Sequence, residues 1–254
     1  MSTLVWIRND LRLLDNPALY EAARLGAVLP VFIWDPDQKR VPGSASRAWL
    51  HHSLKKLEVS MGGLILRRGD SQKELMKLIE QTGVEQVFWN RRYTPQGILT
   101  DTKIKKALKE AGKEVQSFPG NLLFEPWTVA NKQGKPYQVF TPFWKGCLAG
   151  EPPEKPLPKP KRLTYVEGVS SLKLKDLDLL PKIYWDKGFW DVWEPGEEAA
   201  LKKLRRFAEG PVEDYEEERN FPAHEGTSRL SPHLHFGEIS ARTIWSEIKE
   251  ARCF

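Results

Sequence analysis

The chain has 254 residues, and its 40% hydrophobic and 11% aromatic content is typical of a globular protein with a buried core and excludes a disordered one. Lysine and arginine total 39 against 34 acidic residues, and the net charge of +5 favours an anionic partner such as a phosphate backbone without requiring one. Two cysteines, Cys147 and Cys253, are too few and too far apart for a zinc cluster or a disulfide framework, and the five histidines lack metal-ligand spacing, so no metal site is predicted.

The longest apolar run, residues 27–34, is too short to cross a bilayer. Charged residues interrupt the N-terminus where the apolar stretch of a signal peptide would lie. We therefore expect a cytoplasmic protein that does not enter a membrane.

The first 130 residues alternate two kinds of pattern. Short β-branched and aromatic runs predict strands at Thr3–Arg8, Val28–Trp34, Leu64–Arg67, Val84–Asn90 and Glu114–Phe118. Helical patterns lie between them, at residues 17–25, 44–61, 71–82 and 97–111. This alternation predicts an α/β fold with a doubly wound parallel sheet covered by helices on both faces.

Several helix boundaries carry capping chemistry. Asn16 and Pro17 suit an N-cap and a first helical position. Ser71 starts a helix with Glu74 three residues later, which is the spacing of a capping box. Gly83 and Gly112 fall where two of the helices should end.

Residues 131–195 are predicted to form a long connection. Residues 150–162 contain five prolines in thirteen positions, which excludes a helix or a central strand and indicates an extended segment. The aromatic segment Val139–Trp144 contains Pro142 and predicts a packed turn. Further on, Trp185, Trp190 and Trp193 are spaced too unevenly for a helix but indicate that the connection packs against something.

Residues 196–254 are predicted to be helical. The first helix presents five apolar residues on one face and stops at Gly210-Pro211; they are Ala200, Leu201, Leu204, Phe207 and Ala208. A short helix around Tyr215 and a longer one after Ser240, a good N-cap, follow it. About 58 residues of helix with exposed apolar faces make a poor independent domain, so we expect the truncated start of a larger one.

Common nucleotide-binding motifs are absent. No G-x-G-x-x-G follows the first strand, where Arg8-Asn9-Asp10-Leu11-Arg12 stands instead, and no Walker-type loop occurs. The segment Trp6–Leu19 is explained as a strand, a charged loop and a capped helix. A loop with these charges at the carboxyl end of a strand could also hold a ligand.

The segment Tyr215–Pro232 carries a second cluster of polar residues. Thr227, Ser228 and Ser231 place three hydroxyls beside Gly226, on a turn that enters a helix. Ser231 and Pro232 suit an N-cap and a first helical position, and such helix starts bind phosphate groups through free N–H donors. An ordinary capped helix would show the same residues.

Both segments resemble those of the DNA photolyase/cryptochrome family. Arg8–Asn16 is similar to the Arg-x-Asp-Leu-Arg-x-x-Asp-Asn segment that opens the family's α/β domain, and Glu225–Ser231 is similar to the start of its flavin-binding domain. The continuation Leu234–Arg242 and the segment Val139–Trp144 also follow the family pattern. The resemblance implies an α/β antenna-type domain at 1–130, an interdomain connection at 131–195 and the truncated start of an all-α FAD-binding domain at 196–254.

The family resemblance also implies site residues. It assigns FAD contacts to Tyr215, Thr227, Ser228, Arg229, Leu230 and Ser231. Arg219 matches a position that contacts DNA phosphate. Catalytic residues stay unassigned, because the family places the rest of the flavin cavity in downstream helices.

The implied activity is light-driven repair of pyrimidine dimers in damaged DNA, by electron transfer from reduced FAD in a monomeric lyase. A cryptochrome-type blue-light sensor and an inactive truncated fragment are the alternatives. The antenna chromophore is open as well. In the loop Asn90–Gly97, Gly97 aligns with an acid that commonly holds methenyltetrahydrofolate, so a deazaflavin, a folate bound differently or no antenna are all compatible with the sequence.

Overall fold

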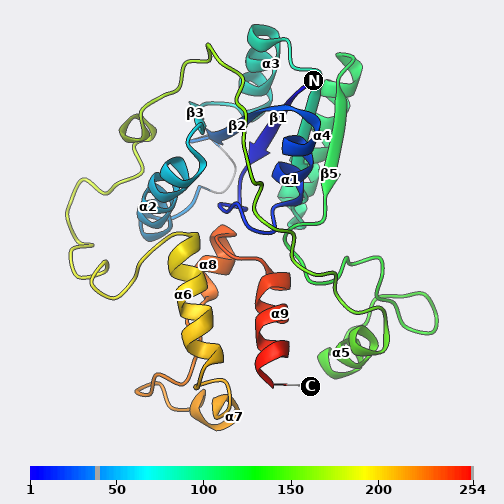
Figure 1. The fold of residues 1–254 in the computed structure, drawn as a ribbon, viewed down its shortest axis with the longest axis vertical. Helices are drawn as coiled ribbons and strands as arrows, with labels where there is room; N and C mark the ends of the chain where they lie inside the picture. Colours follow the sequence, from blue (N-terminus) through cyan, green and yellow to red (C-terminus); the bar gives the residue numbers. More distant parts are fainter. Residues whose placement is uncertain (38–40, 253–254) are drawn as a thin grey trace.

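A five-stranded parallel sheet forms the centre of the first half of the chain (Figure 1). The computed structural model describes residues 1–37 and 41–252, so Cys253 lies outside the described residues. The strands are β1 (Ser2–Ile7), β2 (Ala27–Trp34), β3 (Ile65–Arg68), β4 (Gln86–Asn90) and β5 (Glu114–Phe118). Their order in space is β3-β2-β1-β4-β5, which confirms the predicted doubly wound α/β fold.

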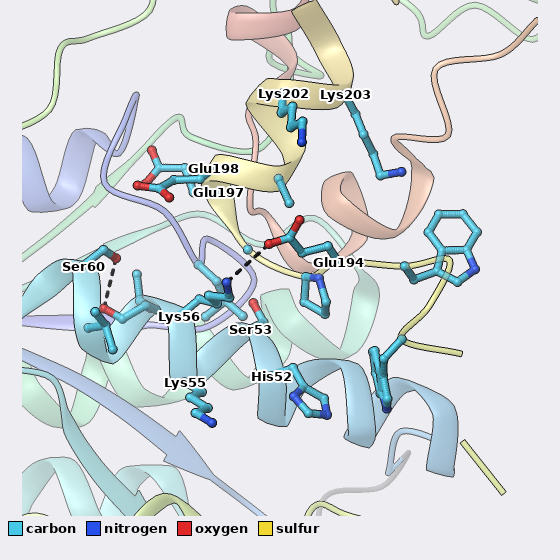
Figure 2. A pocket seen from close by; sticks show the side chains of 18 of the residues that line it. His52, Ser53, Lys55, Lys56, Ser60, Glu194, Glu197, Glu198, Lys202 and Lys203 are labelled. Atoms are coloured by element: carbon cyan, nitrogen blue, oxygen red, sulfur yellow. Dashed lines mark hydrogen bonds and ion pairs between the residues drawn. The ribbon is translucent and has the colours of Figure 1, made fainter. Parts of the chain in front are cut away.

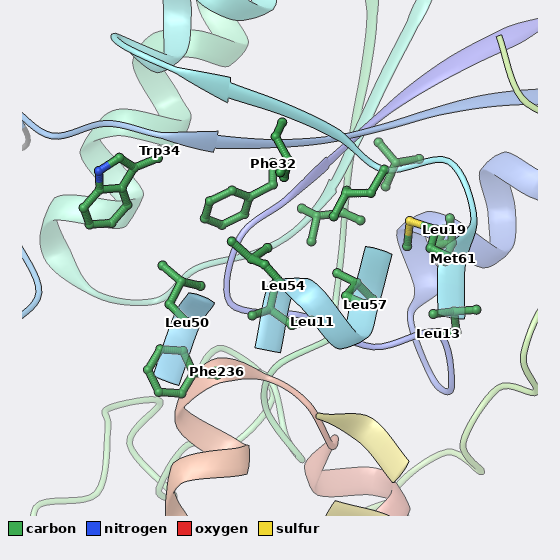
Figure 3. Packing of buried hydrophobic residues seen from close by; sticks show 14 of the residues in the cluster. Leu11, Leu13, Leu19, Phe32, Trp34, Leu50, Leu54, Leu57, Met61 and Phe236 are labelled. Atoms are coloured by element: carbon green, nitrogen blue, oxygen red, sulfur yellow. The ribbon is translucent and has the colours of Figure 1, made fainter. Parts of the chain in front are cut away.

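Helices cover both faces of the sheet. They are α1 (Pro17–Leu25), α2 (Ser44–Met61), α3 (Ser71–Thr82) and α4 (Pro95–Glu110). Alternate residues of β1 enter different cores, because successive strand side chains point to opposite faces. Val5 shares a core with α1 and α2, whereas Leu4 shares one with α3 and α4. Figure 3 shows Leu50 and Leu54 of α2 packed beneath Phe32 of β2.

Two helix starts show which capping predictions were correct. The Asn16 side chain accepts a hydrogen bond from the Leu19 amide at 3.1 Å, which confirms the cap of α1. The predicted capping box at Ser71 was wrong. Asp70 caps α3 by accepting from the Lys73 amide at 2.9 Å, because a carboxylate one residue earlier is a suitable acceptor and leaves Ser71 inside the helix.

The connection contains one helix that the sequence pattern did not predict. Instead of a packed turn, residues 139–144 lead into α5 (Phe140–Ala149). Pro142 lies in its first turn, where the missing proline N–H interrupts no helical hydrogen bond. Residues 151–160 contain neither helix nor strand, as the prolines predict.

After this segment the chain returns across the sheet domain, as Figure 1 shows. The Val28 amide donates to the Thr164 carbonyl at 2.7 Å, and Leu177 of the short 3-10 helix η1 (Leu174–Leu177) is buried in the core beneath α2. Trp190 and Trp193 pack against the same core. The predicted packing of the connection is therefore confirmed at Trp190 and Trp193, whereas Trp185 is 47% exposed.

The remaining helices surround a small core of their own. They are α6 (Glu197–Ala208), α7 (Tyr215–Glu218), α8 (Ser231–Phe236) and α9 (Ala241–Arg252). Their buried cluster consists of Ala200, Leu204, Leu230 and Ile239. Ser240 caps α9 as predicted, with its Oγ accepting from the Thr243 amide at 3.0 Å. So small a cluster leaves this segment dependent on contacts with the sheet domain.

The charged loop after β1 supplies those contacts. Arg12 is 1% exposed, and its guanidinium donates to the carbonyls of Asp15, Gly120 and Gly237. The Arg12 guanidinium therefore joins three segments, namely the loop after β1, the segment after β5 and the end of α8. Arg12 therefore has a structural role, which was one of the two interpretations of this loop.

Asp15 makes the second connection. This buried residue has a left-handed backbone with φ of 51° and pairs with Arg242 of α9 through both carboxylate oxygens, at 2.6 and 3.0 Å. The Leu157 amide of the proline-rich segment also donates to its Oδ1 at 3.0 Å. The sheet domain, the connection and the last helix are thus tied together at Asp15.

We expect Arg12→Lys to lower the free energy of unfolding by about 3 kcal/mol, because an ammonium cannot reach the separate carbonyls that the guanidinium satisfies. Urea denaturation followed by circular dichroism measures this change. Arg24→Lys is the matched control, since Arg24 on α1 is exposed and pairs with the side chain of Glu21. Equal effects of the two substitutions would contradict the role of Arg12.

Candidate functional site

The predicted flavin residues gather at one place on the helical segment. The hydroxyl loop, residues 226–231, lies between α7 and α8. Thr227 and Ser231 are exposed and Ser228 is half-buried, whereas Leu230 is 3% exposed and packs into the small helical core. Leu230 therefore anchors the loop, and the hydroxyl-bearing residues lie at its accessible surface.

The start of α8 differs from the prediction. Ser231 is the first helical residue, and the N-cap position is taken by Leu230, which has no side-chain acceptor. Arg229 has a left-handed backbone with φ of 51°, and the Leu230 side chain is buried. The helix therefore begins at Ser231, one residue earlier than predicted. The first turn of α8 is consequently without a side-chain cap, and its amides can serve an outside acceptor such as a phosphate oxygen.

Helix α7 lies directly against the hydroxyl loop. A Cβ at Gly226 would stand 2.3 Å from the Cβ of Glu218, so only glycine permits this approach. Tyr215, at the start of α7, is 39% exposed and sets its ring edge-on to Phe207 at 5.7 Å. The six predicted flavin residues are therefore borne by two segments in contact.

Arg219 ends α7 and is exposed. Its guanidinium carbon lies 5.7 Å from the centroid of the Tyr215 ring. The predicted DNA contact and the predicted flavin contact at Tyr215 thus lie next to each other.

Cations surround the hydroxyl loop on the side of α6. Arg229 and Lys203 both approach the ring of Trp193, at 4.8 and 5.3 Å from its centroid. Burial lowers the pKa of Lys203, and the nearby charges of Arg229 and Arg206 lower it further. Glu225 balances part of this charge, because it pairs with Arg206 at 2.7 Å and with Arg229 at 3.9 Å. The remaining positive charge favours a bound anion.

A cleft of about 1020 Å³ lies between α2 and α6 (Figure 2), and it shares Trp193 and Lys203 with the surroundings of the hydroxyl loop. Lys56 and Glu194 pair across it at 3.3 Å, and further lysines and carboxylates alternate along its walls. None of the six predicted flavin residues lines it. Because its charges are mixed, the cleft indicates no particular class of ligand.

A third cluster lies where the order of the strands reverses, between β1 and β4. Asp101 of α4 pairs with Arg8 at 3.1 Å and also with Arg92, and both guanidinium groups lie near the ring of Trp6. Burial lowers the pKa of Arg8 to about 10, although the charge of Asp101 opposes this shift. Trp6 Nε1, Arg8 Nε and Arg92 Nε are buried and have no hydrogen-bond partner within residues 1–37 and 41–252.

The sequence analysis named Arg8 as a possible ligand residue but missed Trp6, Arg92 and Asp101. The available signal was the position of Arg8 and Arg92 after two neighbouring strands, because ligands of doubly wound sheets bind at the carboxyl ends where the strand order reverses. Asp101 carried no such signal, since it lies in the second turn of α4.

Gly97 lies buried in the first turn of α4. Its amide donates to the capping hydroxyl of Thr94 at 3.2 Å. A Cβ at this position would stand 2.8 Å from Thr94 Oγ1 and 2.9 Å from the Cβ of Arg92. The position aligned with a folate-holding acid therefore has no room for a side chain.

Comparisons with known proteins identify the family of the chain. The sequence profile of the DNA photolyase family matches residues 3–161. The chain belongs to that family. A deoxyribodipyrimidine photo-lyase of Agrobacterium fabrum is 45% identical over 97% of this chain and 53% of its own length. Cryptochrome-1 of Arabidopsis thaliana is 37% identical over 97% of this chain and 38% of its own.

The fold is shared with solved members. The crystal structure of a class III photolyase from Agrobacterium tumefaciens superposes with a TM-score of 0.93 at 44% identity, covering 97% of this chain and 52% of that one. This photolyase family chain thus spans about half the length of these two relatives.

Two features are missing from residues 1–37 and 41–252. No helix there has the length and apolar character that a membrane span requires. No group of three or more possible metal-ligating side chains was found in the same residues.

We expect Gly97→Glu to lower the free energy of unfolding by about 1–3 kcal/mol, because the new side chain must displace Thr94 and Arg92. Thermal denaturation checks this. Ile98→Glu introduces the same acid at the next position, which is 49% exposed, and should leave stability nearly unchanged. A Gly97→Glu protein as stable as the unaltered chain would show that an acid fits at this position.

Proposed function

We propose that this chain forms one wall of the FAD site in a light-driven lyase that splits pyrimidine dimers in DNA. The supporting observation is the hydroxyl loop, which combines exposed hydroxyls, an uncapped helix start and neighbouring cations. These groups suit the phosphates of a dinucleotide. The division into an α/β domain at 1–130, a connection at 131–195 and the start of a flavin-binding domain at 196–254 belongs to this proposal.

Each predicted residue has a task that its position permits. Thr227, Ser228 and Ser231 would donate hydroxyl hydrogen bonds to phosphate oxygens, and Arg229 would add positive charge. Tyr215 would contribute a second hydroxyl-bearing wall from α7. Leu230, whose side chain is buried, would act by fixing the loop and by its backbone.

Reduced FAD, when bound, supplies the electron that splits the dimer. The role proposed for the protein is to hold that cofactor and the DNA in a fixed geometry. Arg219 would contact a DNA phosphate near the lesion, which is flipped out of the duplex at a cost of a few kcal/mol. We propose that the protein acts as a monomer in the cytoplasm on damaged DNA.

An antenna chromophore would bind at the cluster of Trp6, Arg8 and Arg92. Buried polar atoms without partners lie there, at the reversal of strand order where such sheets bind ligands. The crowded surroundings of Gly97 disfavour a methenyltetrahydrofolate held by an acid at that position. A deazaflavin or a folate in another orientation fits this proposal.

A cryptochrome-type light sensor is the rival function, and the 37% identity to a plant cryptochrome supports it. The two functions share the flavin loop and differ in whether dimers are split. Exposure of dimer-containing DNA to blue light in the presence of the FAD-loaded protein separates them. The repair proposal requires light-dependent loss of dimers, whereas flavin photoreduction without dimer loss supports the sensor.

We expect the chain to bind FAD, and Ser231→Ala to weaken that binding about threefold to tenfold through loss of one hydrogen bond. Titration followed by flavin fluorescence measures the dissociation constant. Ser44→Ala is the matched control, because Ser44 is likewise exposed and begins a helix, α2, at a distance from the loop. A Ser231→Ala protein that binds FAD as tightly as the control would remove Ser231 from the site.

A further inference from the structure

A buried carboxylate lies directly behind the hydroxyl loop. Glu238 follows α8, and its side chain is fully buried. A charge in such a place is tolerated only where several donors satisfy it. The hydrogen-bond partners of Glu238 therefore identify the structural elements that this side chain connects.

Three donor groups from three elements meet at Glu238. Its Oε1 accepts from Trp49 Nε1 of α2 at 3.1 Å and from the Gly196 amide, at the start of α6, at 2.8 Å. Its Oε2 pairs with His233 Nδ1 of α8 at 2.5 Å. The carboxylate thus fastens α8 to both α2 and α6.

The aromatic contacts around Trp49 reinforce this fastening. The indole stacks on Phe236 with centroids 6.0 Å apart and lies edge-on to His233 at 5.3 Å. It also contacts Trp193 at 5.9 Å, the ring that Arg229 of the hydroxyl loop covers. Trp49 therefore contacts α8, which follows the hydroxyl loop, and Trp193, which packs against Arg229 of the loop.

Helix α8 needs such support, because it has only six residues and no side-chain cap. A helix this short is not stable by itself in water. Its direction, and with it the direction of the amides and hydroxyls of the hydroxyl loop, depends on what holds its far end. Among the described residues, Glu238 is the side chain that joins that end to two other helices.

We propose that Glu238 is a positioning residue for flavin binding: through Trp49, His233 and Gly196 it fixes the hydroxyl loop in the orientation that receives the cofactor phosphates. This inference rests on the proposed flavin site. It assigns the α/β domain a part in flavin binding, through α2, although no flavin residue is predicted there.

Hydrogen–deuterium exchange tests the positioning step without any cofactor. Glu238→Gln places an amide group opposite His233 or Trp49, and Trp49→Phe removes only the indole N–H. We expect each to raise the exchange rates of the hydrogen-bonded amides in residues 234–238 about tenfold, the effect of one charged hydrogen bond on local opening. Trp49→Phe keeps the test decisive should Glu238→Gln fail to fold.

Asp15→Asn is the matched control, because it weakens another buried carboxylate pair at the same junction, one that holds α9 instead of α8. FAD titration of the same proteins supplies the second measurement. We expect about tenfold weaker binding for Glu238→Gln and Trp49→Phe, and a much smaller change for Asp15→Asn.

Exchange rates and FAD affinities that change no more in the Glu238 and Trp49 variants than in Asp15→Asn would overturn the inference. Faster amide hydrogen exchange at α8 together with an unchanged FAD affinity would also overturn the inference. If the unaltered chain bound no FAD, the proposed function of this chain would fail, and the exchange comparison would still decide whether Glu238 fixes the loop.

Discussion

The buried guanidinium of Arg12 is the interaction on which the rest of the structure depends. It reaches carbonyl oxygens that belong to the loop after β1, the segment after β5 and the end of α8. Backbone carbonyls in such a place need a donor, and water cannot supply it where the side chain is 1% exposed. One arginine therefore satisfies three segments that lie far apart in the sequence.

Gly237 shows how closely these parts are fitted. A Cβ there would stand 1.9 Å from the Asn9 carbonyl oxygen, and its backbone has φ of 67°. Glycine alone combines this backbone with so close an approach. The end of α8 is thereby pressed onto the charged loop, so the segment Leu234–Arg242 forms a single junction with Arg8–Asn16.

This junction explains how a helical segment with a small core can be ordered. The cluster around Leu204 and Leu230 is small, but Arg12, Asp15 and Glu238 each connect the segment to the sheet domain or its connection. The hydroxyl loop precedes α8 in the chain, whereas the junction with the sheet domain follows it. Leu230 of the loop is buried, and the hydroxyl-bearing residues of the loop are accessible. A rigid support behind an accessible loop is the arrangement that a binding site requires.

The sequence predicted most of the sheet domain, because its strands are apolar runs and its helices begin and end at residues with strong local preferences. Asn16 is an example, since its cap depends only on neighbours along the chain. The prediction failed where packing decides. Ser231 has the chemistry of a cap, yet burial of Leu230 moves it into the helix, and α5 forms around a proline that suggested a turn.

The candidate site was predictable only in part for the same reason. The hydroxyl loop was identified from residue types and from family resemblance, both of which are visible in the sequence. Glu238 and Trp49 are 189 positions apart, and their contact follows from the tertiary fold alone. The pairing of Arg8 with Asp101 could not be predicted from the sequence either, because the two residues are 93 positions apart.

We infer that the helical segment is held in place by the sheet domain and does not fold by itself. Native-state hydrogen exchange in increasing low concentrations of denaturant tests this dependence. We expect the most protected amides of α8 and α9 to open together with those of β1, with the same free energy and the same dependence on denaturant. A separate opening of α6–α9 at lower free energy, with β1 still protected, would contradict it.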